Sequence, residues 1–531
     1  MSIVVNNLSY ALPDGTSIFS NISFSIGRQS RCALVGANGC GKSTLMDILI
    51  KKLAPGGGEM FLSDSPYLVP QHYGQYDSLT VAEALGVDRK LTALHSIISG
   101  DASEENFILL EDDWSVEERV RSALDFWGLN HVTPDTAMSS LSGGEKTEVF
   151  LSGISIYNPE IILLDEPTNH LDEDARTKLY GFMETVPATV LAVSHDRIFL
   201  NRFSEFYELS DKGLRLYHGS FEEYLAAVEN ENLALVRHAD CLRKELRKEK
   251  MIAREVAERQ QRHNSRGQRH SEKKCVARIA MGNLKNNAEN STARLAGSHQ
   301  VKIERLSDSV SEAYSAIRDI KKMVVDFSSS DLHAGKVLLE AHGVNHGFGN
   351  GKFLWYEPLD FTIRSGDRIR VTGSNGSGKS TLMKIITGDL IPVCGSVVKS
   401  GNLRHAYLDQ DYSLIDDSLS VSGQILRYNH SSLPEHELNT RLNRFLFPKS
   451  AWDKPCAALS GGEKMRLSLC CLMVADNAPD IIIADEPTNN LDLYNTEVLV
   501  DTLNSYSGTL IVISHDTSFI NRLSLGIELS L

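Results

Sequence analysis

The chain has 531 residues, too many for one ordinary hydrophobic core, so about three structural units are expected. Its composition is typical of globular proteins, and no apolar run approaches the roughly 20 residues that cross a bilayer. Residues 1–10 lack a basic region followed by an apolar one, so we expect neither a membrane-spanning nor a secreted protein. The net charge of the chain is −15, although one segment of it is strongly basic.

The eight cysteines are scattered along the chain, and none forms a CxxC pair. This pattern argues against a zinc site and against a redox pair. Free thiols in a reducing cytosol fit it best, so we expect a cytoplasmic protein.

The first chemical signal is a glycine-rich loop between a predicted strand and a predicted helix. The apolar strand at 32–35 leads into 36–44, GANGCGKST, which matches GxxxxGK[ST]. Glycines let backbone N–H groups turn toward phosphate oxygens, and the helix adds its positive N-terminus. We expect Lys42 to reach the terminal phosphates and the Ser43 hydroxyl to bind Mg²⁺, since a chance glycine turn explains this context poorly. The residues expected to bind nucleotide here are Gly36, Asn38, Gly39, Gly41, Lys42, Ser43 and Thr44.

The next signals come in a fixed order along the chain. Gln71 alone would indicate nothing, and it gains meaning from the LSGGE segment at residues 141–145 and the buried apolar strand at 161–164. Asp165 at the strand end suits Mg²⁺ binding, and Glu166 is placed to polarise a water that attacks a γ-phosphate.

A last strand, residues 189–194, is followed by His195. A lone histidine would favour a structural role. At a strand end after this series, contact with a γ-phosphate is the better interpretation.

The same series repeats in the second half of the chain. The interval from the strand-end glutamate to the histidine is 29 residues in both copies. The matching nucleotide-binding residues are Gly373, Asn375, Gly376, Gly378, Lys379, Ser380 and Thr381. The matching later residues are Gln410, Ser460, Gly462, Asp485, Glu486 and His515.

The first copy carries about 21 extra residues after Gln71, which we place within 87–115. This insertion is acidic, and its acids include Glu104, Glu105, Glu111, Asp112 and Asp113. It is either a contact arm or a longer loop, and the sequence leaves both open.

The complete series, present twice, resembles the ATP-binding cassette superfamily over nearly all of both halves. Two further features resemble its F subfamily, soluble proteins with paired cassettes. The sequence EPTNxLD follows each strand, at 166–172 and 486–492, and a long charged linker follows an aromatic-glycine turn at 217–221. The resemblance implies a translation factor or ribosome-protection protein that binds near the tRNA exit site, with the linker reaching toward the peptidyl-transferase centre.

The resemblance also implies an α/β fold with two tandem P-loop ATP-binding cassette domains joined by a long antiparallel α-helical linker. We expect the first cassette at residues 1–218, the basic linker at 219–334 and the second cassette at 335–531. An aromatic residue stacks on adenine in similar cassettes, and Phe348 fits that place. The aligned residue of the first copy is Leu12, with Tyr10 nearby.

The implied activity is Mg²⁺-dependent hydrolysis of ATP to ADP and phosphate at two sites, each shared between cassettes. Lys42, Gln71, Asp165, Glu166 and His195 would face Ser460 and Gly462. Lys379, Gln410, Asp485, Glu486 and His515 would face Ser142 and Gly144. Catalysis is assigned to Glu166, Glu486, His195 and His515, and Mg²⁺ binding to Ser43, Gln71, Asp165, Ser380, Gln410 and Asp485.

The linker contains the basic segment of the chain. Residues 241–302 contain 16 Lys and Arg against six acids, a net charge of +10, and no aromatic residue. Apolar residues at helical spacing predict two antiparallel helices with a turn between Asn264 and Asn290. Such a rod suits RNA phosphates, read by shape and not by base sequence. A rigid, solvated spacer is the alternative.

We therefore expect an ATP-gated protein that contacts ribosomal RNA, and tRNA as a further candidate, through the linker, with both cassettes pairing inside one monomer. The main rival is the energising subunit of a membrane transporter, which has no use for a basic helical hairpin. A DNA-repair-type cassette ATPase is the third interpretation, and it would normally carry a much longer coiled coil.

Overall fold

The computed structural model describes most of the chain. It leaves aside residues 14, 102, 211, 272–299, 314–332, 334, 348–352, 375, 402, 410–411, 430–432, 476–478 and 490, and it describes only the backbone of 260, 261, 263–271, 493 and 494. Three predicted site residues, Phe348, Asn375 and Gln410, therefore lie outside the described residues. Lys273 and Lys274 of the predicted rod tip do so as well.

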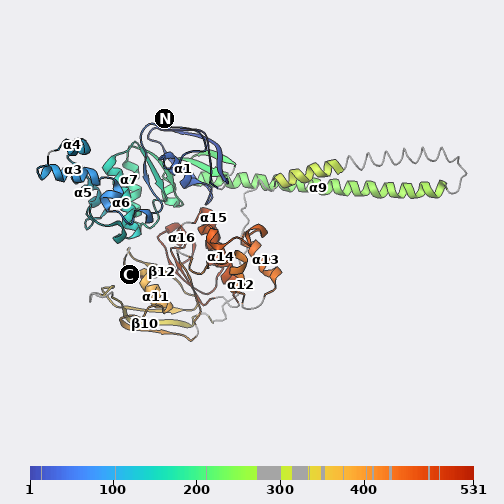
Figure 1. Cartoon of the computed structure of the whole chain (residues 1–531). Coiled ribbons are helices and arrows are strands. Elements are labelled where there is room, and N and C mark those ends of the chain that lie inside the picture. Colours follow the sequence, from blue (N-terminus) through green and yellow to red (C-terminus); the bar gives the residue numbers. More distant parts are fainter. Residues whose placement is uncertain are drawn as a thin grey trace. The chain divides into compact units, whose positions relative to one another are not determined.

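The first cassette contains two sheets (Figure 1). The antiparallel sheet has the order β2 (Ser17–Ile26), β1 (Ile3–Ala11) and β4 (Gly57–Leu62). The larger sheet has the order β5 (Tyr67–Val69), β6 (Ile161–Asp165), β7 (Thr189–Val193), β3 (Arg31–Val35), β8 (Glu205–Ser210) and β9 (Gly213–His218), and only β9 is antiparallel to its neighbour. Its helices are α1 (Lys42–Leu49), η1 (Gly74–Tyr76), α2 (Val81–Leu85), α3 (Asp88–Ile98), α4 (Glu104–Leu110), α5 (Val116–Trp127), η2 (Met138–Ser140), α6 (Gly143–Tyr157), α7 (Glu173–Thr185) and α8 (Arg197–Leu200).

The second cassette repeats this plan. Its antiparallel sheet has the order β11 (Leu359–Arg364), β10 (Val337–Asn345) and β13 (Cys394–Lys399). Its parallel sheet has the order β14 (His405–Leu408), β15 (Ile481–Asp485), β16 (Thr509–Ile513), β12 (Arg368–Thr372) and β17 (Ile527–Ser530). Its helices are α11 (Lys379–Thr387), α12 (Val421–Arg427), α13 (Glu435–Arg444), η3 (Lys449–Ala451), η4 (Cys456–Ala458), α14 (Gly461–Val474), α15 (Leu493–Ser505) and α16 (Thr517–Arg522). The predicted α/β fold with two tandem cassettes is confirmed.

The central strands of each parallel sheet hold the site residues in place. Every residue of β6 and of β7 is buried, as expected for parallel strands covered on both faces. Since parallel strands end at one edge of the sheet, β3, β6 and β7 deliver the phosphate loop, Asp165 and His195 to the same edge.

The extra residues of the first copy form helices α3 and α4, which pack against each other. Lys90 of α3 forms an ion pair with Glu111 at 2.7 Å, and Arg119 of α5 binds Asp113 at 2.7 Å. The insertion is therefore a folded helical subdomain, and its role as a contact arm stays a prediction.

The basic linker begins as one long helix, α9 (Phe221–Ser271), drawn in green in Figure 1. Residues 300–313 are helical and run beside it in the opposite direction, and Lys302 Nζ lies 2.5 Å from Glu249 Oε1. This pairing agrees with the predicted antiparallel arrangement. The helix continues to Ser271, past the first residues of the range 264–290 in which we expected the turn. Gly267 does not end it, because one glycine inside a helix costs only about 1 kcal/mol.

Two compact units divide the chain. One holds both cassettes, Met1–Phe221 and Lys322–Leu531, and the other is the linker, Glu222–Lys321. Among the residues that the structure describes, no helix is both long enough and apolar enough to cross a membrane.

Candidate functional site

The phosphate loop of each cassette ends in a glycine with positive φ at the start of the following helix. Gly41 precedes α1 with φ of 98°, and a Cβ there would lie 2.4 Å from Ile18 Cγ2. Gly378 precedes α11 with φ of 93°, and its Cβ would lie 2.4 Å from Leu354 Cδ2. Only glycine fits both the backbone conformation and the space.

The loop lysines point back over their own loops. Lys42 Nζ donates to the carbonyls of Gly36 at 2.8 Å and Ala37 at 3.1 Å, and Lys379 makes the matching contacts at 2.7 and 3.0 Å. Phosphate oxygens bind an ammonium more strongly than neutral carbonyls do. Both lysines can therefore exchange these contacts for the phosphates of a nucleotide.

The strand-end aspartates lie beside the serines that follow the lysines. Ser380 Oγ donates to Asp485 Oδ2 at 3.4 Å, and Tyr407 Oη donates to the same oxygen at 2.6 Å. Asp165 contacts Ser43, while burial raises the pKa of its carboxyl, and its Oδ1 is buried without a hydrogen-bond partner among the described residues. A buried carboxylate oxygen of this kind is suited to bind a cation.

The glutamates that follow adopt a backbone conformation that non-glycine residues rarely occupy. Glu166 has φ of 52° and Glu486 has φ of 46°, and such strain is typical of functional sites. Burial raises the pKa of Glu166 to about 8 and that of Glu486 to about 7. Each carboxylate lies against the following histidine, with Nε2 to Oε1 distances of 3.3 Å for His195 and 3.6 Å for His515.

A cavity of about 420 Å³ covers the first phosphate loop, within the roughly 300–1,000 Å³ typical of small-molecule sites. Ser460 and Gly461 of the second cassette complete it, as the face-to-face arrangement requires. Gly462, which we expected there, is buried against Asn495 of its own cassette. The lining residues are Ile18, Asn38, Gly39, Gly41, Lys42, Ser43, Thr44, Gln71, His72, Asp165, Glu166, Val193, His195, Ser460 and Gly461.

The matching cavity of the second site also takes residues from both cassettes. Ser142 and Gly144 come from the first cassette, and Gly376, Glu486 and His515 come from the second. Lys379 and Gly373 line a neighbouring cavity together with His515. Ser380 and Thr381 follow Lys379 in α11. Among the described residues, the structure thus brings most of the predicted ones together at both sites, with Gly462 as an exception, while their roles remain proposals.

Sequence reasoning missed several residues of these sites. Ile18 of β2 lines the first cavity, whereas Leu12, which is 40% exposed, does not. Tyr407 binds Asp485, but the corresponding residue of the first copy is Leu68, so no repeat marked it. Arg176 lines the second cavity and belongs to no motif of the series.

Two phosphate loops, two LSGGE segments and two strand-end Asp-Glu pairs on a duplicated α/β fold define a tandem ATP-binding cassette protein. The family model described as "ABC transporter" matches residues 19–169 and 356–489. The chain belongs to this ATP-binding cassette family and to its F type. ATP binding and hydrolysis are the general activity of such domains.

Two curated relatives and one solved structure match nearly the whole chain. The ATP-binding protein YdiF of Bacillus subtilis is 31% identical over 99% of this chain and 79% of its own length. The ribosome protection protein VmlR of the same species is 28% identical over 98% of this chain and 85% of its own length. A solved complex of the archaeal ribosome recycling factor aABCE1 shows the same fold, with a TM-score of 0.56 at 17% identity, covering 98% of this chain and 86% of that one.

Proposed function

We propose that this protein is a Mg²⁺-dependent ATPase that acts on the ribosome, as a translation factor or as a ribosome-protection protein that confers antibiotic resistance. The exposed basic surface of the linker carries the proposal. Each lysine and arginine of α9 between residues 243 and 262 is exposed to solvent or partly so. They are Arg243, Lys244, Arg247, Lys248, Lys250, Arg254, Arg259 and Arg262.

Charge separation supports an RNA partner. Residues 241–302 carry +10, while the rest of the chain carries −25. A polyanion would bind the linker and be repelled by the cassettes, because cationic side chains release counterions from phosphates. With no aromatic residue in this segment, base stacking contributes nothing and backbone phosphates are the expected ligands. The relative VmlR is named for ribosome protection.

Shared sites supply the means by which ATP controls binding. Because Ser460 closes the first cavity and Ser142 the second, ATP at either site is held by both cassettes. Binding therefore favours the closed pair, and hydrolysis with product release lets it open. Since both cassettes lie in one chain, we propose that the protein works as a monomer. A ribosomal partner implies that it acts in the cytoplasm.

The residues beside the phosphate loops fit a magnesium ion. Ser43, Gln71 and Asp165 bring oxygen ligands to the first cavity, and Mg²⁺ prefers such ligands. Ser380, Gln410 and Asp485 are their counterparts in the second cassette. When bound, the ion would neutralise charge on the β- and γ-phosphates.

Co-sedimentation with ribosomes tests the proposal. We expect the double variant Glu166→Gln with Glu486→Gln to sediment with ribosomes in the presence of ATP and to remain in solution without it. If this variant ignores ribosomes under both conditions, or instead co-fractionates with membranes, the ribosomal function is wrong. Growth of a host strain on ribosome-targeting antibiotics then separates a protection protein, which raises resistance, from a translation factor, which does not.

A further inference from the structure

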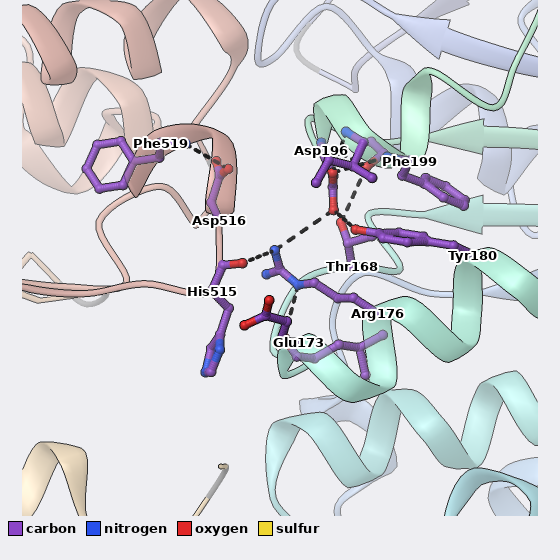
Figure 2. A network of polar contacts seen from close by, with 12 residues as sticks. Thr168, Glu173, Arg176, Tyr180, Asp196, Phe199, His515, Asp516 and Phe519 are labelled. Carbon is purple, nitrogen blue, oxygen red and sulfur yellow. Dashed lines mark hydrogen bonds and ion pairs between the residues drawn. The ribbon is translucent and has the colours of Figure 1, made fainter. Parts of the chain in front are cut away.

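Arg176 is a buried cation that joins the two cassettes. It lies in the first turn of α7, and its side chain is 11% exposed. Its Nε donates to the carbonyl of Leu171 at 3.0 Å, and its Nη1 donates to the carbonyl of His515, in the second cassette, at 3.1 Å. Figure 2 shows the guanidinium between the two histidine loops. A planar guanidinium held at two points has little freedom left, so it can fix the group it binds.

The same guanidinium also faces the histidine loop of its own cassette. Its Nη1 lies 3.9 Å from Asp196 Oδ2, and Asp196 directly follows His195. Asp196 is itself held firmly, because it accepts hydrogen bonds from Tyr180 Oη at 2.5 Å and from the N–H groups at the start of α8. One cation therefore connects the loop of His195 with the backbone of His515 (Figure 2).

Among the residues that the structure describes, the matching position of the second cassette does not repeat this contact, and α15 reaches the first histidine loop by a different ion pair, between Glu497 Oε1 and Arg197 Nη2 at 3.0 Å. Counting from the aspartate that precedes each helix, Asp172 or Asp492, the residue of the second cassette that matches Arg176 is Thr496. Its Oγ1 donates to the carbonyl of Asp492 within its own helix, at 3.0 Å. The two composite sites are thus chemically different, although their motifs are the same.

We propose that Arg176 is a positioning residue for the second ATP site alone, which fixes the backbone of His515 from the first cassette and links its position to the histidine loop of the first site. Holding the His515 carbonyl fixes the direction in which the imidazole leaves the backbone. That imidazole lies 3.3 Å from Lys379 Nζ and 3.6 Å from Glu486 Oε1. Without the Arg176 guanidinium, the His515 imidazole would be held less firmly beside Lys379 and Glu486.

Single-site variants separate the two sites in the full-length protein. Glu166→Gln leaves the second site as the hydrolysing one, and Glu486→Gln leaves the first. Adding Arg176→Met should lower turnover roughly 10- to 100-fold in the Glu166→Gln protein, the range that a small misplacement at a reaction centre costs. In the Glu486→Gln protein the change should stay below about twofold. Thr496→Val is the matched control and should leave both proteins unchanged.

Comparing kcat with KM distinguishes positioning from simple loss of packing. With Arg176→Met, kcat of the second site should fall while its KM for ATP stays within about twofold, and Arg176→Lys, which keeps a cation at this place, should recover part of the lost kcat. Equal losses in both single-site proteins, or a loss at the second site that lies in KM alone, would overturn the proposal. The assay contains no ribosomes, so its outcome is independent of the proposed ribosome binding.

Discussion

The Nζ atom of Lys379 lies 3.3 Å from Nε2 of His515. A protonated imidazole would face a like charge at this distance, which agrees with the lowered pKa of His515, about 4, caused first by burial and then by Lys379. His515 is therefore neutral at physiological pH and can accept or donate a hydrogen bond without repelling the lysine. Glu486, which lies against His515, changes its charge near neutral pH, because burial raises its pKa to about 7.

Hydrolysis at both sites should rise with pH between about 6 and 9. Only the carboxylate form of a glutamate can accept a proton from water, and the pKa is about 8 for Glu166 and about 7 for Glu486. Measured in the single-site variants, the second site should reach half of its maximal rate at a lower pH than the first. Rates that fall with rising pH would contradict the assignment of these glutamates as bases.

Replacing both glutamates by glutamine should stop turnover and keep ATP bound. The amide removes the base, which should cost roughly 10²–10⁴-fold in rate, but it leaves the phosphate loops around Lys42 and Lys379 intact. Single-turnover hydrolysis and nucleotide retention on a filter measure the two effects separately. Hydrolysis of the double variant at the wild-type rate would show that the bases lie elsewhere.

Replacing Glu166 alone by glutamine should stabilise the nucleotide-free protein at alkaline pH. The folded-state pKa of Glu166, about 8, lies above the ordinary glutamate value of 4.5, so folding stability is lost as pH rises from the ordinary value toward the folded one. Glutamine does not titrate and avoids this loss. We expect Glu166→Gln to unfold at a higher temperature than wild type at pH 9, by roughly 2–4 °C per kcal/mol for a cassette of this size. The difference should shrink toward pH 5, and thermal melts at both pH values check it.

A bulky residue at Ser142 should damage the site of the opposite cassette. Ser142 lines a cavity with Gly376 and caps α6, where its hydroxyl accepts from Glu145 N. Ser142→Arg should therefore lower nucleotide occupancy at the site of Lys379 more than at the site of Lys42. Photo-crosslinking of labelled ATP followed by separation of the two halves reports each occupancy. Selective loss at the Lys42 site would refute the face-to-face arrangement.

The sequence predicted the parts of the site that a chemical motif specifies. The phosphate loops, Asp165 and Glu166 need defined residue types at defined spacing, and the carboxyl ends of parallel strands bring them together. Arg176 could not be found this way, because its contact with His515 depends on how two cassettes meet and not on a local pattern. The neighbouring glycine of the second LSGGE segment is a related case, since the structure places Gly461 on the cavity and Gly462 against Asn495, and the role of Gly462 stays a prediction.

Substitution of basic residues in the linker tests whether its basic surface binds RNA or the linker only separates the cassettes. Replacing five basic residues around the end of α9 by Gln should weaken ATP-dependent ribosome binding and flatten its dependence on salt, because fewer counterions are released on binding. These residues are Arg262, Arg266, Arg269, Lys273 and Lys274. For duplex DNA, six to ten phosphate contacts lose roughly 10³–10⁵ in affinity between 50 and 200 mM salt, and we expect the same direction here.

A control variant loses the same number of positive charges near the start of the basic segment. It tests whether the position of the charges matters or only their total. It replaces Arg243, Lys244, Arg247, Lys248 and Lys250 by Gln. Arg243 precedes Arg262, the first residue of the other set, by 19 residues of α9, roughly 28 Å at ~1.5 Å per residue. If the end of the hairpin meets ribosomal RNA, the first variant loses more affinity than the control. Both should keep wild-type ATPase activity without ribosomes, because none of the ten residues belongs to a nucleotide motif. If both variants sediment with ribosomes as wild type does at every salt concentration, the linker is a spacer.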